Sequence, residues 1–223
     1  MNASLADTGA GPLPPTLPIF PLEGALLLPR AKLPLNIFEP RYLSMVEDAL
    51  AGDRLIGMIQ PRETQPNPVP DEVEVYDVGC AGRISSFSES EDGRYLITLT
   101  GINRFTVKRD LGIMRGYRRF AVRYDDFPDD QAAEGGPIGN RTKLLSVTRE
   151  FFEATGITGD WDTMQAVPDD ALVTALAMIC PLESRDKQAL LECRTVAERS
   201  EFLTHLLEFR TRAGDEDSSL PRQ

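Results

Sequence analysis

Side chains that could perform chemistry are few in this chain, and their spacing matches no common catalytic or metal site. His205 is the only histidine, which excludes a zinc site built from several histidines. Cys80, Cys180 and Cys193 are widely separated and form no Cys-x-x-Cys pair, so we expect reduced thiols, with Cys180 buried. We expect His205 at the boundary or the exposed face of a helix. We therefore predict no metal, no cofactor and no catalytic residue.

Motifs for nucleotide binding and nucleophilic catalysis are also missing. No G-x-x-x-x-G-K-[ST] run is present to hold a nucleotide phosphate, and no G-x-S-x-G marks a hydrolase serine. Asp125-Asp126 and Asp129-Asp130 pair carboxylates near a turn, but acid–base catalysis needs surroundings that separate their pKa values. We favour solvated linker charge for these aspartates. The chain is predicted not to be an enzyme, and an undetected hydrolase is the alternative ranked last.

One basic cluster interrupts an otherwise acidic chain. Its arginines alternate with aromatic residues: Arg115, Arg118, Arg119 and Arg123 with Tyr117, Phe120 and Tyr124. A strand of this kind could stack single-stranded RNA, or it could be an ordinary strand whose arginines balance nearby acids. The net charge of -11 favours the second interpretation and argues against nucleic acid or anionic membranes as partners. No apolar run approaches the length of a membrane-spanning helix.

Prolines divide the first part of the chain into short extended pieces. Strands are expected at Leu17–Leu22, Ala25–Leu28 and Lys32–Phe38, and a helix over Arg41–Leu50 after Pro40. Further strands are predicted at Leu55–Gln60, Glu72–Tyr76, Val78–Phe87, Tyr95–Thr100, Arg104–Lys108 and Tyr117–Tyr124. Gly79 and Gly82 indicate a bulge or a close backbone approach, and Asp92-Gly93 favours a hairpin turn.

The composition changes after Phe127 and predicts helices. Asn140 is expected to begin a helix that Gly156 ends, and Asp169-Asp170 to open a helix over ALVTALAMIC that is buried nearly all round and ends at Pro181. Arg185–Cys193 and a capping box of Thr195 with Glu198 predict two more. The predicted division is a disordered leader 1–16, a β-rich part 17–127, a linker 128–139, a helical part 140–211 and a disordered tail 212–223. The leader lacks the pattern of a secretory signal, so we expect a cytoplasmic protein.

A family resemblance follows from motifs in a fixed order. They are Phe20-Pro21-Leu22, Leu26-Leu27-Leu28-Pro29, Leu33-Pro34-Leu35 and Phe38-Glu39-Pro40-Arg41-Tyr42, then Val78 to Ile84, Gly101 to Phe105, Ala171 to Met178 and Asp186 to Leu191. The pattern resembles the N-terminal, substrate-binding domain of Lon-type ATP-dependent proteases. The match covers roughly Leu17 to Phe209, which makes it far more specific than one short motif.

The resemblance implies an α+β fold: an N-terminal β-rich, PUA-like pseudo-barrel with one helix, followed by a C-terminal α-helical bundle. It also implies a stand-alone binding protein, because the ATPase region and the Ser-Lys peptidase region of Lon proteases are not found here. The expected ligand is a polypeptide or a partner protein, including a separate Lon or other protease. A small-molecule- or RNA-binding regulator that uses the same barrel is the alternative, and the oligomeric state is left open.

Six residues are candidates for a peptide-binding groove beside an exposed strand edge. Phe38, Tyr42 and Phe105 are the expected apolar contacts, and Arg41, Arg83 and Arg104 the expected polar rim. The other interpretation is structural: the prolines shape the fold, and Glu39 and Arg41 brace the first helix. For individual residues we favour the structural role.

Overall fold

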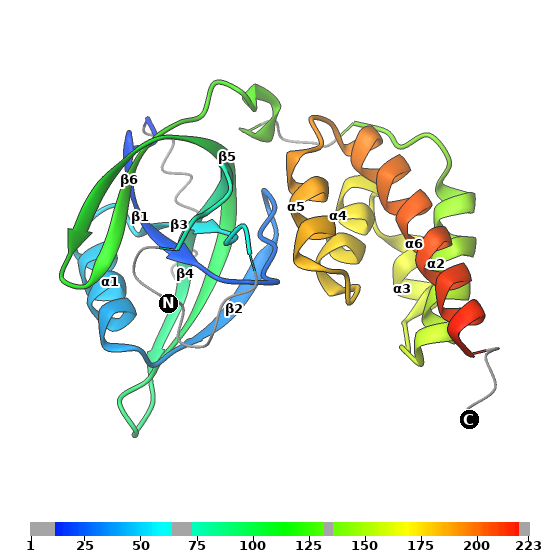
Figure 1. Ribbon diagram of the computed structural model, residues 1–223, viewed down its shortest axis with the longest axis horizontal. Coiled ribbons are helices and arrows are strands. Elements are labelled where there is room, and N and C mark those ends of the chain that lie inside the picture. The colour runs from blue at the N-terminus through cyan, green and yellow to red at the C-terminus, as the bar shows by residue number, and fades with distance from the viewer. Residues whose placement is uncertain (1–11, 64–72, 132–135, 219–223) are drawn as a thin grey trace, which may run out of the picture.

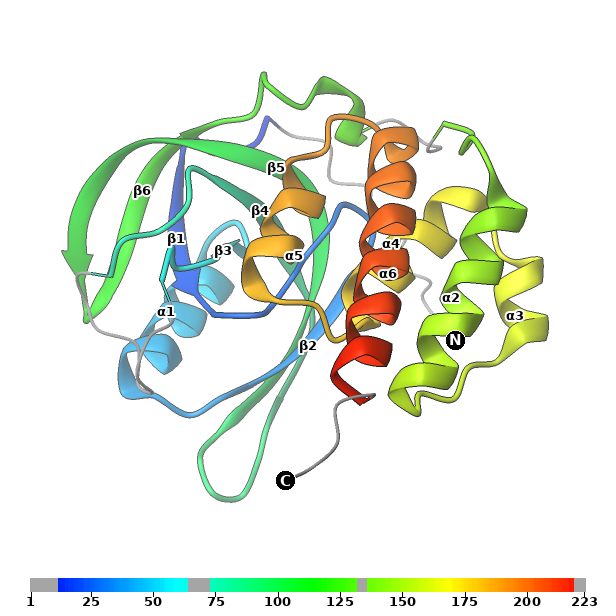
Figure 2. The same ribbon diagram turned by 45° about the vertical axis from the view of Figure 1, so that its right-hand side comes forward.

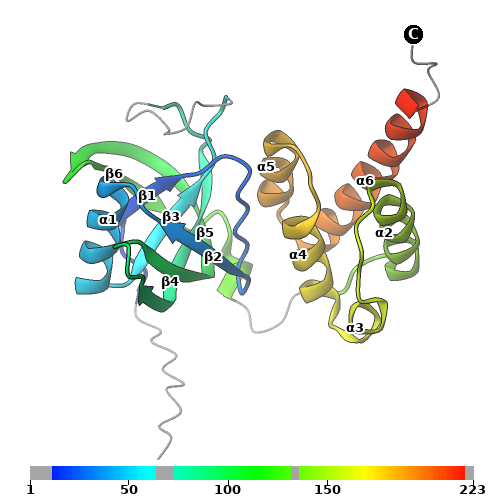
Figure 3. The same ribbon diagram turned by 90° about the horizontal axis from the view of Figure 1, so that it is seen from below.

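The computed structural model describes residues 12–63, 73–131 and 136–218, and it has two parts that lie side by side (Figure 1). One part contains the strands and the first helix, and the other contains the remaining α-helices. The helix α1 lies on the side of the strands away from the helical part (Figure 3). Most of the predicted leader, the first residue of the predicted strand Glu72–Tyr76, part of the linker and the end of the tail lie outside the described residues.

Six strands form one sheet in the order β2-β5-β4-β3-β1-β6. Their bounds are β1 Thr16–Pro21, β2 Lys32–Ile37, β3 Leu55–Ile59, β4 Val78–Glu89, β5 Tyr95–Met114 and β6 Tyr117–Arg123. The first half of β5 pairs with β2 and β4, and its second half pairs with β6. The last strand in this order, β6, therefore pairs with β5 as well as with β1. Only β1 and β3 run parallel, and β2 has one neighbour in the described sheet.

The proline-rich start folds largely as predicted. Pro40 occupies the first turn of α1 (Pro40–Ala51), and the buried face of this helix consists of Tyr42, Met45, Val46 and Ala49. The prediction of a strand at Ala25–Leu28 is wrong, because this segment is an irregular loop. Leu26, Leu27 and Leu28 are buried in it, and the next turn bonds to the sheet through Arg30 N, which donates to Gly101 O at 2.8 Å. Hydrophobicity alone did not distinguish this buried loop from a strand.

Glycines allow the strands and loops to approach closely, as predicted for Gly79 and Gly82. The β4–β5 register shifts between Ala81 and Gly82. A Cβ atom on Gly79 would lie 2.4 Å from the Phe105 ring and 2.5 Å from the Met58 carbonyl oxygen. The predicted Asp92-Gly93 turn closes the β4–β5 hairpin, which projects beyond the rest of the sheet (Figure 2).

Two apolar cores hold the molecule together. A small core lies among the strands and contains Phe105, with Leu17, Ile19, Leu55, Ile59, Ala81, Phe120 and Val122. The larger core contains residues of the strands, of α1 and of the buried leucine loop, and it continues into the helices, where Leu172, Leu190 and Leu203 belong to it. The two parts therefore share one continuous core.

The helical part has five α-helices in the described chain: α2 Arg141–Thr155, α3 Trp161–Ala166, α4 Asp169–Ile179, α5 Ser184–Glu192 and α6 Val196–Ser218. The helices α2 and α6 pack along each other (Figure 2). The predicted caps are confirmed at Asn140, which accepts from Lys143 N, at Gly156, and at the Thr195–Glu198 box. The short helix α3 was not predicted, and α6 continues past Thr211.

Candidate functional site: the cleft between the two parts

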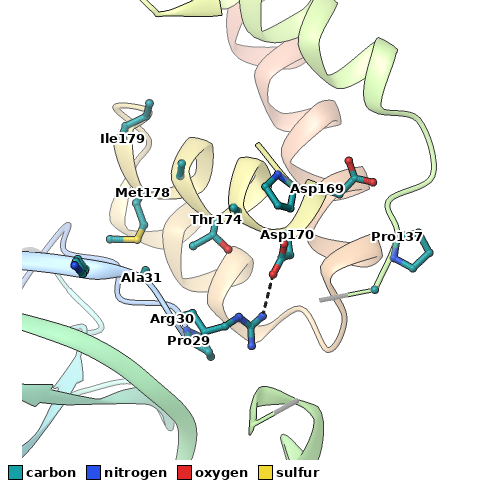
Figure 4. A pocket seen from close by; sticks show the side chains of 14 residues that line it. Pro29, Arg30, Ala31, Pro137, Asp169, Asp170, Thr174, Met178 and Ile179 are labelled. Atoms are coloured by element: carbon teal, nitrogen blue, oxygen red, sulfur yellow. Dashed lines mark ion pairs between the residues drawn. The ribbon is translucent and has the colours of Figure 1, made fainter. Parts of the chain in front are cut away.

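A cleft of about 820 Å3 separates the segment that precedes β2 from helix α4 (Figure 4). Its lining is mainly apolar, and Arg30 and Asp170 reach across it to form an ion pair of 3.5 Å. The lining residues are 29–32, 136–137, 168–171, 174–175 and 178–179. Concave apolar sites with a few polar groups are the usual form of ligand sites.

Helix α4 presents an exposed apolar stripe to this cleft. Ala171, Ala175 and Ile179 are four residues apart, all three are exposed, and all three line the cleft. Ile179 is 57% exposed, which is unusual for a large aliphatic side chain. The prediction that this helix is buried nearly all round is therefore wrong on one face. Because the whole helix is apolar, its sequence did not show which face the core leaves uncovered.

The strand β2 offers a backbone edge beside the cleft. The Ala31 carbonyl accepts from Gly101 N, and antiparallel alternation then directs Leu33 and Leu35 toward β5. The backbone groups of Lys32, Pro34 and Asn36 consequently face away from the sheet. Lys32 also lines the cleft. Proline is tolerated at such a position because an outward amide is not needed in the ladder.

Asp169, at the rim of the cleft, is paired with Arg141. Asp169 accepts hydrogen bonds from Arg141 and from the amide of Ile138. The Arg141 guanidinium, through this hydrogen bond, lowers the pKa of the Asp169 carboxyl below its ordinary value. Arg141 also donates to the carbonyl oxygens of Met164 and Val167 at 2.8 Å each, so it anchors the loop that leads into α4.

Arg104, a predicted rim residue, is buried and joins the two parts. Its guanidinium pairs with Asp130 and also donates to the carbonyl oxygens of Leu191 (2.9 Å), Arg194 (3.1 Å) and Cys193. These carbonyls lie at the end of α5, where the helix dipole favours a cation. The prediction that Asp130 is solvated linker charge is wrong, because Asp130 is itself buried. A surface role for Arg104 is likewise ruled out by its 3% exposure.

A second set of hydrogen bonds fixes the loop before β2 against α5. The side chain of Gln60, buried in the structure, accepts from Gly24 N and donates to the carbonyl oxygen of Ser184 at 3.0 Å. Lys187 donates to the carbonyl oxygen of Gly24 at 2.9 Å. Together with Arg104 these bonds hold the two walls of the cleft in one arrangement.

The other predicted site residues do not form a common groove. Phe38 is exposed, and Arg83 donates to the Asp53 carbonyl oxygen near the end of α1. Tyr42 and Phe105 are buried in different cores, so neither offers an apolar contact at the surface. Arg41 binds Glu39 through Nε and Nη2, at 3.0 Å and 2.8 Å, which agrees with the bracing role that we favoured. None of these five residues lines the cleft.

The basic cluster has the features of an ordinary strand. Arg115 pairs with Glu47 and Asp48, Arg118 with Asp110, and Arg123 with Asp126. Two of its three aromatic residues, Tyr117 and Phe120, are buried and offer no face for base stacking.

The thiols and the histidine lie away from the cleft. Cys80 and Cys180 are buried, as predicted for Cys180, and burial raises the pKa of the Cys180 thiol to about 12. His205 is exposed on α6, in agreement with its prediction. Among the described residues, no group of three or more His, Cys, Asp or Glu side chains could hold a metal ion. No helix in the described part of the chain is both long and apolar enough to cross a membrane.

Comparison with known proteins gives the same family as the ordered motifs. A sequence profile of the ATP-dependent protease La (LON) substrate-binding domain matches residues 16–208. The chain belongs to this family. This LON substrate-binding domain is 26% identical over 199 residues to a Lon protease of Dictyoglomus thermophilum, which covers 87% of the chain and 24% of that protease. It is 34% identical over 94 residues to Lon protease 2 of Sorangium cellulosum, which covers 42% of the chain and 12% of the relative.

Solved structures show the same fold. A Lon N-terminal domain protein from Xanthomonas campestris superposes with a TM-score of 0.61 at 25% identity, covering 85% of this chain and 97% of that one. The N-terminal domain of Mycobacterium avium complex Lon protease gives a TM-score of 0.57 at 15% identity, covering 86% of this chain and 97% of that one. The LON substrate-binding domain described above thus has the mixed α/β fold of these structures, and it spans about a quarter (24%) of the length of the first curated relative.

Proposed function

We propose that this domain binds extended polypeptide segments in the cleft and performs no catalysis itself. The bound segment adds its backbone to the outer edge of β2 and places apolar side chains against α4. The single observation that carries the proposal is the open edge of β2 beside an apolar cleft. An extended peptide can obtain affinity from backbone pairing and specificity from the pockets beside the strand.

The geometry of the cleft supports a short apolar segment as the ligand. Its volume of about 820 Å3 lies in the range of protein ligand pockets. Ala175 and Ile179 supply an apolar surface, while Lys32 supplies outward backbone groups on the opposite wall. Asn36 lies farther along the same strand edge, outside the lining of the cleft. The partner is accordingly a polypeptide or a partner protein, including a separate Lon or other protease.

The RNA-binding alternative has less support. Its basis is a PUA-like pseudo-barrel, and the pairing of β5 with both β4 and β6 supports that comparison of folds. Three of the four arginines in the cluster, Arg115, Arg118 and Arg123, are paired with carboxylates, however. The overall charge of -11 also opposes phosphate-driven binding. Polypeptide is therefore the ligand that we propose.

Substitution of Ile179 tests the proposal. Fluorescence anisotropy of labelled extended peptides, drawn from a panel of unfolded model proteins, measures the affinity. Ile179→Glu should weaken peptide binding at least about tenfold, because it places a charge on the apolar wall of the cleft. The fold should be unaffected, since Ile179 is already exposed.

Ile113→Glu is the matched control. Ile113 is 54% exposed and lies near the β5–β6 turn, where it does not line the cleft. The same charge at this position should leave peptide affinity unchanged. Equal losses for the two variants, or no binding by any peptide of the panel, would contradict the proposed function.

A further inference from the structure

A second cavity of about 480 Å3, called the inner cavity below, adjoins the cleft and lies between residues 129–130 and 136–137 and the start of α6. The two cavities share the lining residues Pro29, Arg30 and Thr174, with Gly136 and Pro137. A ligand that occupies the apolar cleft can therefore reach the inner cavity without leaving the protein surface. Four of the 14 residues that line the cleft are charged, whereas six of the 13 that line the inner cavity are charged.

The inner cavity is basic in an acidic protein. Its charged lining consists of four arginines and two aspartates: Arg30, Arg104, Arg194, Arg199, Asp129 and Asp130. Arg104 forms an ion pair with Asp130, and Arg30 forms one with Asp170. Arg194 and Arg199 form no ion pair with a carboxylate among the described residues. In a chain of net charge -11 this is an unusual local excess of positive charge.

Arg199 is the most informative of these residues. It is only 4% exposed, and its partners are carbonyl oxygens: Nε donates to Leu190 at 2.8 Å and Nη2 to Cys193 at 3.3 Å. Nη1 has no partner within the described chain. Burial, followed by the charge of Arg104, lowers the pKa of Arg199 to about 10. A buried cation is costly unless an anion compensates it, and here the cavity beside it has room for one.

The start of α6 faces the same cavity. Val196 and Ala197 line it, and they are the first two residues of the helix, whose amides have no intrahelical acceptor. The Glu198 carboxylate accepts from the amides of Arg194 and Thr195, and Thr195 Oγ1 accepts from Glu198 N. The amides of Val196 and Ala197 have no acceptor in the described part of the chain. Such amides, at the positive end of a helix dipole, favour an anion.

We propose that the inner cavity binds a carboxylate of the polypeptide in the cleft, held by Arg194, Arg199 and the first amides of α6. This inference rests on the proposed function and specifies its ligand: an extended segment with apolar side chains and one anchoring carboxylate. That carboxylate is either the C-terminus of the polypeptide or an acidic side chain. The arginine forks and the helix amides suit its two oxygens.

Titration of the 15N-labelled full chain with N-acetylalanine tests the site without a peptide. The amide resonances of Val196 and Ala197 should shift saturably, and N-acetylalanine amide, which lacks the charge, should not shift them. Arg194→Gln should weaken this binding about fivefold, because it removes one charge-assisted contact. Arg212→Gln removes the same charge from the exposed far end of α6 and should have no effect. Arg194 is exposed, so its variant tests the site even if Arg199→Gln fails to fold.

Several results would overturn the inference. They are no shift at Val196 and Ala197, equal shifts with the uncharged amide, and shifts produced by inorganic phosphate but not by N-acetylalanine. Peptides with a free C-terminus, an amidated C-terminus, or glutamine in place of glutamate then identify the source of the carboxylate. Weaker binding after amidation of the C-terminus, or after replacement of glutamate by glutamine, supports the inference. Peptides that bind equally well without any carboxylate overturn the inference and leave the proposed function intact. N-acetylalanine binding without binding of any peptide supports the carboxylate site and overturns the polypeptide as its ligand, together with the proposed function.

Discussion

Arg104 and Asp130 form a buried ion pair in which Arg104 Nη2 lies 2.7 Å from Asp130 Oδ1 and Arg104 Nε lies 3.0 Å from Asp130 Oδ2. The backbone amide of Arg104 donates to the same carboxylate at 2.8 Å. Arg104 belongs to β5, and Asp130 to the short turn Pro128–Gln131 that leaves the strands. Arg104 also donates hydrogen bonds to the carbonyl oxygens at the end of α5. One side chain therefore links the sheet, the turn Pro128–Gln131 and the helical part.

Removal of one partner from this pair should destabilise the whole chain. Asp130→Asn leaves the buried Arg104 guanidinium without its carboxylate, and such a change costs about 3–5 kcal/mol of unfolding free energy. Urea denaturation followed by circular dichroism measures this loss.

The exposed pair of Arg62 and Asp77, at 3.0 Å, supplies the control for that experiment. Asp77→Asn should change the unfolding free energy by less than about 1 kcal/mol, because water screens a surface pair. Similar losses for Asp130→Asn and Asp77→Asn would show that the buried pair does not join the two parts.

Close packing at Gly79 gives a second prediction about stability. Gly79→Ala should destabilise the chain by about 1–3 kcal/mol, because the added Cβ would lie 2.4 Å from the Phe105 ring. Gly136→Ala is the comparison, since no atom of the described residues lies within 4 Å of the corresponding Cβ. Thermal unfolding should show a lower midpoint for the first variant alone. Two unchanged midpoints would mean that the strand packing is looser than described.

Burial of Cys180 predicts a loss of stability at alkaline pH. Its thiol has an ordinary pKa of 9.0, which burial raises to about 12 in the folded chain. Between these values the unfolded thiol loses its proton while the folded thiol keeps it. Stability is therefore complete below pH 9 and falls above it, by at most about 1.4 kcal/mol per pH unit for this group.

Urea denaturation midpoints measured from pH 8 to pH 10.5 test this fall of stability with rising pH. Cys180→Ala should have a lower midpoint at pH 8, because it leaves a cavity, but a shallower fall above pH 9. An identical slope in the two proteins would contradict the role given to the Cys180 thiol.

The family motifs and the helix caps could be read from the sequence because they depend on local chemistry. Pro40 begins a helix, Asn140 caps one, and Asp92-Gly93 closes a hairpin, whatever surrounds them. Irregular segments were harder. The leucine loop before Pro29 has the composition of a buried strand, and only its tertiary contacts show that it is not one.

The site itself depends on which faces remain uncovered when the two parts meet. Phe105 was expected at the surface and lies in the strand core, while Ile179 was expected in the core and lines the cleft. A signal for the cleft was present in the four-residue spacing of Ala171, Ala175 and Ile179. It could not be separated from the apolar remainder of α4 without the arrangement of the helices.

Hydrogen exchange of the β2 amides tests the central claim most directly. Amide exchange is measured residue by residue, with and without a saturating extended peptide selected from the panel described above. Pairing along the strand edge predicts that the outward amides of Lys32 and Asn36 become protected, while those of Leu33 and Leu35, already bonded to β5, change little. A bound peptide that leaves Lys32 and Asn36 unprotected would contradict polypeptide binding at this edge.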